Sequence, residues 1–259
     1  MRIPRKPVIV SVLVLASVTA FAQQKDYRVV ATTSWTAALA MAAGVTDIVV
    51  LAPSELRHPA EYELKPSDIM ALEGADLIVS TGFEVMAKKL AAAVGTQHIT
   101  VLQVDADYSL PTMRKSILAI AKAVGTTTKA QESVTALENF MASWKEELQK
   151  SGLYGASVLA HVFQKPLMDE LGFSVQGLFG PGPIEAPQIV KLSAAKATLI
   201  VDNWHNEAAA PLRETLPRVR YISLINFPGP DGTVTLLDVL ADNRKRLSSP
   251  LTRISHTFN

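Results

Sequence analysis

The chain contains no cysteine, which removes all the chemistry that this residue supplies. An exported protein without cysteine forms no disulfides and depends on its core for stability. No cysteine is present to carry a lipid anchor, and no thiolate can bind a metal ion. A metal site must therefore use histidine, carboxylate, carbonyl or amide ligands. With 259 residues, 48% of them hydrophobic, the chain is long and apolar enough to bury a large core.

Long apolar runs are also missing, except for one near the start of the chain. Three basic residues precede an apolar stretch over residues 8–20, and residues 20–22 have the small-x-small form of a cleavage motif. This pattern predicts a secretory signal peptide over residues 1–22, whose removal leaves a periplasmic protein. The alternative is a retained N-terminal anchor. No other stretch is long enough to cross a bilayer.

A strongly basic or acidic segment is absent as well. The chain has 25 lysines and arginines, 24 acidic residues and a formal net charge of +1. Loss of the signal peptide removes three positive charges and no acid, so the net charge becomes −2. A nearly neutral chain without a basic block lacks the electrostatic footprint of nucleic-acid binding. We therefore expect no nucleic-acid partner, and no membrane insertion after cleavage.

Short apolar runs of strand length alternate with helix-like segments along the chain. Candidate strands cover residues 28–33, 46–51, 76–80, 98–101, 156–160, 173–178, 198–201 and 219–224. Helical segments lie between them, over residues 35–43, from Pro66 onward, and over residues 187–197 and 207–215. This β-α-β-α order predicts an α/β protein with parallel sheets covered by helices on both faces. We expect an N-terminal lobe over residues 23–125 and a C-terminal lobe over residues 153–259.

Residues 126–152 predict one long helix between the two lobes. Its apolar residues recur at spacings of three or four and form a single stripe, made of Val134, Leu137, Met141, Trp144 and Leu148. Thr127 and Thr128 are candidate N-terminal caps, and Gly152 ends the pattern. A helix of about 24 residues is a rod of about 36 Å, which predicts a rigid spine. The alternative is an ordinary surface helix of one larger domain.

Histidines follow three of the predicted strands. His161 comes directly after a short apolar run, and His58 and His205 follow two other strands. Ligands of parallel sheets bind in the crevice outside the carboxyl ends of the strands. Three imidazoles can therefore converge on one crevice, which points to a bound metal ion.

A series of motifs in a fixed order covers nearly the whole chain after residue 22. The segments are residues 30–35, residues 61–68 with the sequence Pro-Ser-Asp at their end, and residues 75–82, 161–173, 185–187 and 235–243. This series resembles the cluster A-I solute-binding proteins, the receptors of bacterial ABC importers for zinc and manganese. The resemblance implies two α/β lobes joined by one long helix, with metal in the cleft between them.

The resemblance matches the ligand positions only in part. His161 matches the third ligand, and His58 lies two residues from the first ligand position, which Ala60 occupies. The second ligand, a histidine, is expected near residues 107–111, where there is none. Asn226 stands near the position of the fourth ligand, an aspartate. The histidine-rich loop of many zinc receptors is absent.

The predicted metal ligands are His58, His161, His205, Asp202 and Glu61, with Asp107 as a further candidate. Mostly imidazole ligation favours zinc, with manganese or iron as alternatives. The alternative to ligation is a solvated loop position for His58, and a helix cap or a solvated loop position for His205. His98 and His256 are expected to take no part.

The leading functional hypothesis is a monomeric periplasmic receptor, without catalytic residues, that delivers a divalent transition metal to the permease of an ABC importer. The incomplete ligand set motivates a second hypothesis, a periplasmic metallochaperone that passes metal to another exported protein. A third is an exported metal hydrolase in which Glu61 acts as general base beside an open zinc position.

Overall fold

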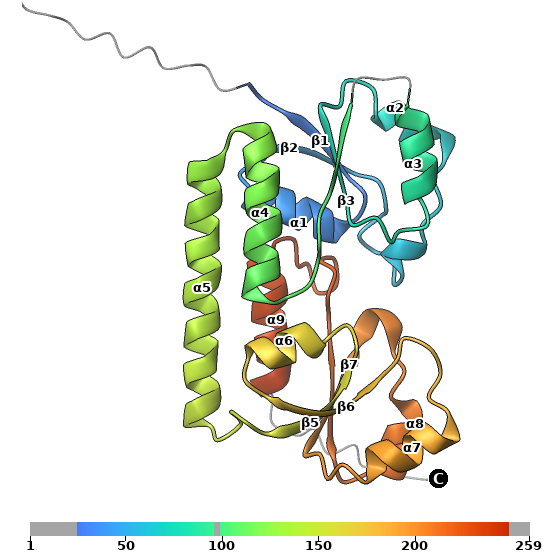
Figure 1. Cartoon of the computed structure of the whole chain (residues 1–259), viewed down its shortest axis with the longest axis vertical. Coiled ribbons are helices and arrows are strands. Elements are labelled where there is room, and N and C mark those ends of the chain that lie inside the picture. The colour runs from blue at the N-terminus through green and yellow to red at the C-terminus, as the bar shows by residue number, and fades with distance from the viewer. Residues whose placement is uncertain (1–24, 96–98, 249–259) are drawn as a thin grey trace, which may run out of the picture.

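The computed structural model describes residues 25–95 and 99–248, and its two lobes lie one above the other along the long axis of the molecule (Figure 1). The predicted signal peptide over residues 1–22, His98 and His256 lie outside the described residues. No helix in the two described ranges is long and apolar enough to span a membrane.

The N-terminal lobe contains a four-stranded parallel sheet in the order β2-β1-β3-β4. Its strands are β1 (Arg28–Ala31), β2 (Asp47–Val50), β3 (Leu77–Ser80) and β4 (Thr100–Gln103). Its helices are α1 (Ser34–Ala42), the 3-10 turn η1 (Pro59–Glu61), α2 (Pro66–Ala71), α3 (Ala87–Val94) and α4 (Leu110–Val124). The central strand β3 is buried along its whole length, as expected for a parallel sheet with both faces covered.

The C-terminal lobe repeats this arrangement with a parallel sheet in the order β6-β5-β7-β8. Its strands are β5 (Ser157–His161), β6 (Ser174–Phe179), β7 (Leu199–Asn203) and β8 (Arg220–Leu224). Its helices are α6 (Lys165–Glu170), α7 (Ala186–Ser193), the 3-10 turn η2 (Trp204–Asn206), α8 (Ala210–Thr215) and α9 (Leu236–Ser248). The predicted fold class, two α/β lobes with parallel sheets, is confirmed.

The predicted strands are all present, with boundaries that differ by one or two residues. Two helices are shorter than expected. The helix predicted over residues 207–215 begins only at Ala210, because the backbone N–H groups of Ala208 and Ala209 bind the carboxylate of Asp202. The helix predicted over residues 187–197 ends at Ser193.

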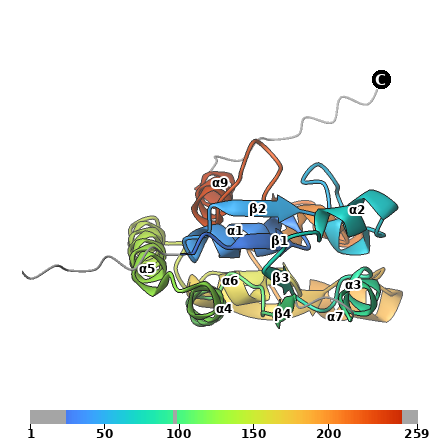
Figure 2. The ribbon, with the colours of Figure 1, turned by 90° about the horizontal axis from the view of Figure 1, so that it is seen from above.

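The predicted spine is helix α5 (Thr127–Lys150), which runs along one side of both lobes with α4 beside it (Figures 1 and 2). All five residues of its predicted stripe are buried. The expected cap was wrong: the N-cap is Thr126, and its hydroxyl donates to the carbonyl of Ala43 instead of to the helix. One hydrophobic cluster extends from the N-terminal lobe through α5 into the C-terminal lobe, so the lobes share a core.

Candidate functional site

A cavity of about 590 Å³ lies between the two lobes. The residues around it follow the carboxyl ends of all eight strands, where parallel sheets bind their ligands. The N-terminal lobe contributes Trp35, residues 57–61, Phe83, Ala106 and Asp107. The C-terminal lobe contributes Phe163, Pro181, Asn203, His205, Asn226 and Phe227, among others. The fold therefore brings the two sets of strand ends to one cavity, as the sequence predicted.

An aromatic cluster links the lobes beside this cavity. Trp35 lies in the first turn of α1 and is only 4% exposed. Its ring stacks on Tyr108 at a centroid distance of 5.1 Å and meets the edge of Phe227 at 5.2 Å. The hydroxyl of Tyr108 donates to the carbonyl of Asn226 across the lobe boundary, at 3.2 Å. The aromatic side of the cavity is thus built by both lobes together.

His205 lines the cavity from η2 and is almost fully buried. Burial lowers the pKa of His205 to about 3; the side chain of Asn226 opposes this shift, and Arg57 and His58 add to it. Its Nδ1 atom accepts the backbone N–H of Asn226 at 3.4 Å. Because Nδ1 is an acceptor, the proton of the neutral ring lies on Nε2, which has no hydrogen-bond partner among the described residues.

His161, the residue that matches the third ligand of the family, does not line the cavity. Its Nδ1 accepts the backbone N–H of Phe163 at 3.1 Å, and its Nε2 pairs with Oδ1 of Asn206 at 3.2 Å. The ring is fully buried against Phe163 and Phe179, and burial lowers its pKa. Both ring nitrogens are occupied, so His161 supports the cavity wall from behind.

Asp202 also has a structural role in this structure. Its buried carboxylate accepts hydrogen bonds from the backbone of Asn203, Ala208 and Ala209 and from the hydroxyl of Tyr221. These bonds fix the loop between η2 and α8. Asp202 is not among the residues that line the cavity.

His58 and Glu61 lie on the cavity wall at the two ends of η1, and both are exposed. Neither side chain has a hydrogen-bond partner in the described part of the chain. Asp107 also lines the cavity, but its carboxylate is bonded to Ser109 and Thr112 at the start of α4.

The predicted ligand set is therefore not assembled. Within residues 25–95 and 99–248, no group of three or more histidine, aspartate or glutamate side chains is placed to hold one metal ion. His58, Glu61 and His205 share the cavity, whereas His161 and Asp202 bind neighbouring protein groups.

The cavity is also lined by two residues with polar groups that the sequence did not single out as site residues, Trp35 and Asn203. Four fully buried atoms of its lining residues have no hydrogen-bond partner among the described residues: Nε1 of Trp35, Nδ2 of Asn203, Nε2 of His205 and Oδ1 of Asn226. Asn203 ends β7 and Asn226 follows β8. Both thus lie at the carboxyl end of a strand, as the three predicted histidine ligands do. Buried polar groups without partners are rare in folded proteins and require an explanation.

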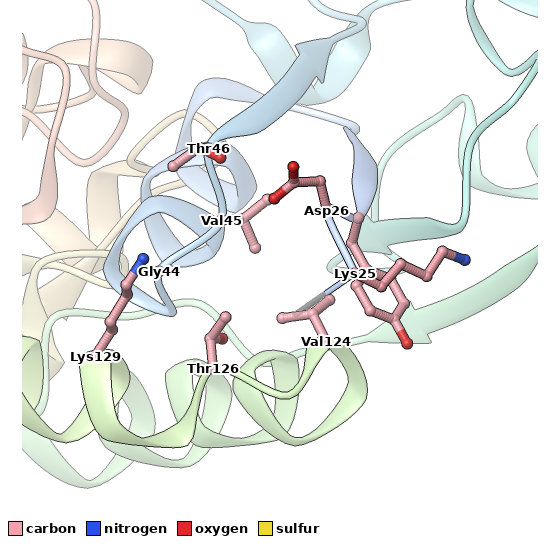
Figure 3. Close-up of a pocket in the computed structure, with 9 residues that line it drawn as sticks. Lys25, Asp26, Gly44, Val45, Thr46, Val124, Thr126 and Lys129 are labelled. Atoms are coloured by element: carbon pink, nitrogen blue, oxygen red, sulfur yellow. The ribbon is translucent and has the colours of Figure 1, made fainter. Parts of the chain in front are cut away.

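A second cavity, of about 80 Å³, lies at the opposite end of the N-terminal lobe (Figure 3). Its wall includes Lys25 and Asp26 before β1, Gly44 before β2, and Thr126 and Lys129 around the α4–α5 turn. It lies at the amino ends of the strands and contains none of the predicted site residues. Its volume fits only a few water molecules.

Sequence comparisons found no relative: no protein-family model matches the chain, and no curated protein matches it. Comparison of structures gives a clear result. The solute-binding protein FpvC from Pseudomonas aeruginosa in complex with Mn²⁺ has a TM-score of 0.66 at 18% identity, over 86% of this chain and 96% of its own.

Two further structures agree. The laminin-binding protein Lbp of Streptococcus pyogenes has a TM-score of 0.65 at 16% identity, over 86% of this chain and 98% of its own. The Mn-bound periplasmic metal-binding protein from Candidatus Liberibacter asiaticus has a TM-score of 0.60 at 17% identity, over 85% and 98%. The chain has the fold of the metal-binding solute-binding proteins. Identities this low establish the fold alone.

Proposed function

We propose that this chain is a periplasmic receptor that captures a divalent transition metal, zinc first, and delivers it to the permease of an ABC importer. The observation that supports this function best is the cavity between the lobes, which the carboxyl ends of all eight strands surround. The same fold occurs in solved structures described as metal-binding proteins of the periplasm or as solute-binding proteins in complex with Mn²⁺.

Polar contacts join the two lobes around the cavity. Arg57 and Glu207 form an ion pair of 3.0 Å between the lobes, and Arg57 also lies over the ring of Trp204. Both partners are about half exposed, so the pair contributes no more than about 1 kcal/mol. The hydroxyl of Tyr108 donates to the carbonyl of Asn226, and the hydroxyl of Ser34 donates to the carbonyl of Pro228; both bonds also join the two lobes. Opening of the cavity by a permease would have to break these polar contacts and the packing of Trp35 against Phe227.

His58 and Glu61 are the cavity side chains best placed to contact a metal ion, with His205 deeper in the same wall. Zinc prefers about four nitrogen, oxygen or sulfur ligands. Imidazole nitrogen favours zinc over manganese, which accepts more carboxylate oxygen. The described cavity residues supply only part of such a ligand set, so solvent would complete it.

The test is native mass spectrometry of the mature chain purified from periplasm. We expect one divalent metal per chain, and loss of that metal in the double variant His58→Ala/Glu61→Ala. The matched control is Glu63→Ala, which removes an exposed carboxylate on the same segment that does not line the cavity. Protein that carries no metal after growth in zinc-rich medium would refute the metal-receptor proposal.

A further inference from the structure

The loop between β8 and α9, residues 225–235, reaches across to the N-terminal lobe. The carbonyl of Pro228 accepts the hydroxyl of Ser34 at 2.7 Å. A Cβ atom on Gly229 would lie 2.2 Å from the carbonyl oxygen of Ser54, so the two backbones are in close contact at this point. A change in the backbone of this loop therefore acts on the contact between the lobes.

The same loop contains Asp231-Gly232, the only place in the chain where glycine follows an aspartate or an asparagine. Asp231 has a φ of +55°, a left-handed conformation that residues with a side chain adopt at a cost. Its carboxylate is 67% exposed. Nothing lies within 4 Å of the position that a Cβ atom on Gly232 would take. Asp231 is thus strained and open to solvent, and the next residue has no side chain to shield its amide.

An aspartate in this position can react with the backbone that follows it. The amide nitrogen of Gly232 attacks Cγ of the Asp231 carboxyl group in its acid form. A C–N bond forms, a C–O bond breaks, and the amide proton leaves with the hydroxyl as one molecule of water. Water then opens the five-membered imide at either carbonyl, which restores aspartate or gives isoaspartate with one extra carbon atom in the main chain. The reaction needs no oxidant, reductant or enzyme.

We propose that Asp231 is a site of spontaneous isoaspartate formation and that Arg246 slows the reaction. The guanidinium of Arg246 binds the carboxylate of Asp231 at 2.6 Å, and the backbone N–H of Gly232 donates to the carbonyl of Gly229 at 3.2 Å. Both reacting groups are therefore held by other partners. Isomerisation lengthens the loop and takes the carboxylate away from Arg246, so it loosens the segment that contacts Ser34.

The test is to age the mature chain at neutral pH and physiological temperature for several weeks. Peptide mapping with electron-transfer fragmentation then distinguishes isoaspartate from aspartate. Trypsin releases residues 221–244 as one peptide, which contains Asp238 and Asp242 as well as Asp231. We expect isoaspartate at position 231 and none at 238 or 242, because those two aspartates lie within α9 and precede larger residues.

Two variants of α9 test the role of the ion pair. Arg246→Gln releases Asp231, and it also releases Asp242, which Arg246 binds within the helix. We expect isoaspartate to form about threefold faster at position 231, a factor typical of the loss of one partly exposed ion pair, and still not at 242. Arg244→Gln is the matched control, because Arg244 pairs with Glu147. Thermal melting verifies that both variants fold.

Faster formation in Arg246→Gln than in both the parent chain and Arg244→Gln supports the inference. Absence of isoaspartate at position 231 from all three proteins would overturn it. Equal rates in the three proteins, or an equal acceleration in the two variants, would also overturn it, because the ion pair would then have no specific effect. None of these results depends on whether the chain carries a metal ion, so the proposed function is tested separately.

Discussion

Gly180 determines where the ring of His161 can lie. A Cβ atom at this position would be 2.2 Å from Nε2 of His161, and the backbone of Gly180 has a φ of +73°, which favours glycine. The ring of His161 thus occupies the space in which the Cβ atom of any other residue at position 180 would lie. The sequence predicted His161 as a metal ligand and gave no sign of this contact. The contact between them depends on the pairing of β5 with β6, which single residues do not reveal.

We predict that Gly180→Ala lowers the free energy of unfolding by about 2–3 kcal/mol, because it strains the backbone and displaces His161 from its two hydrogen bonds. Denaturant unfolding measures the change. Gly182→Ala is the matched control, since nothing lies within 4 Å of its Cβ position and it should change the stability by less than about 0.5 kcal/mol. Equal effects of the two substitutions would contradict this role of Gly180.

Glu84 predicts a pH dependence of stability. Burial alone would raise its pKa, but hydrogen bonds from the hydroxyl of Thr32 at 2.6 Å and the backbone N–H of Thr81 at 2.9 Å outweigh burial, and the pKa is lowered from 4.5. The unfolded chain therefore binds the proton more tightly than the folded chain. This stabilisation is complete above pH 4.5 and is lost as the pH falls through the folded pKa.

Denaturant unfolding between pH 7 and pH 3 tests this prediction. We expect Glu84→Gln to be less stable than the parent chain at pH 7 and to have a shallower loss of stability below pH 4.5. The comparison of slopes is needed because other carboxyls, such as Glu147 and Asp238, also have lowered pKa values. Parallel slopes for the two proteins would exclude Glu84 as a contributor.

At the scale of elements, hydrophobic periodicity located the strands and the spine helix well. Short apolar runs and regularly spaced apolar residues indicate which positions are buried. Buried positions of this kind occur both in the strands of the sheets and in the apolar stripe of α5. The boundaries and caps were less accurate because they depend on distant partners. The hydroxyl of Thr126 binds the carbonyl of Ala43, and the carboxylate of Asp202 binds the backbone before α8; neither contact is visible in a local pattern.

Met141 tests the contribution of α5. Its side chain is fully buried within the cluster that joins both lobes to the helix. We expect Met141→Ala to lower the free energy of unfolding by about 2–5 kcal/mol, since it leaves a cavity in that cluster. Glu132→Ala, on the exposed face of the same helix, should change it by less than about 0.5 kcal/mol. A small effect of Met141→Ala, as measured by denaturant unfolding, would show that α5 is not part of the core.

At the scale of the whole molecule, the sequence predicted that two parallel sheets direct their carboxyl ends to one crevice. The structure confirms the two sheets and places a cavity at those ends. The ligand set was less predictable, because the position of a residue after a strand does not fix the direction of its side chain. His205 lines the cavity, whereas His161 and Asp202, which also lie at strand ends, do not line it and bind neighbouring protein groups.

The ion pair between Arg57 and Glu207 predicts an effect on lobe opening with little effect on folding. Glu207→Gln should change the free energy of unfolding by less than about 1 kcal/mol and increase the dissociation rate of a bound ligand by up to about fivefold. Stopped-flow dissociation measures the rate. Lys89→Gln is the control, because it breaks a similarly exposed pair with Glu63 inside one lobe. If both variants release ligand at the parent rate, the pair does not hold the lobes together.

The central claim is that the cavity between the lobes carries the cargo. The most direct test is a crystal structure of the mature chain purified from periplasm, with anomalous diffraction recorded at the zinc edge. The account predicts an anomalous peak inside the cavity, near His58 and Glu61. A cavity that contains only water, with the metal bound elsewhere on the chain, would contradict it.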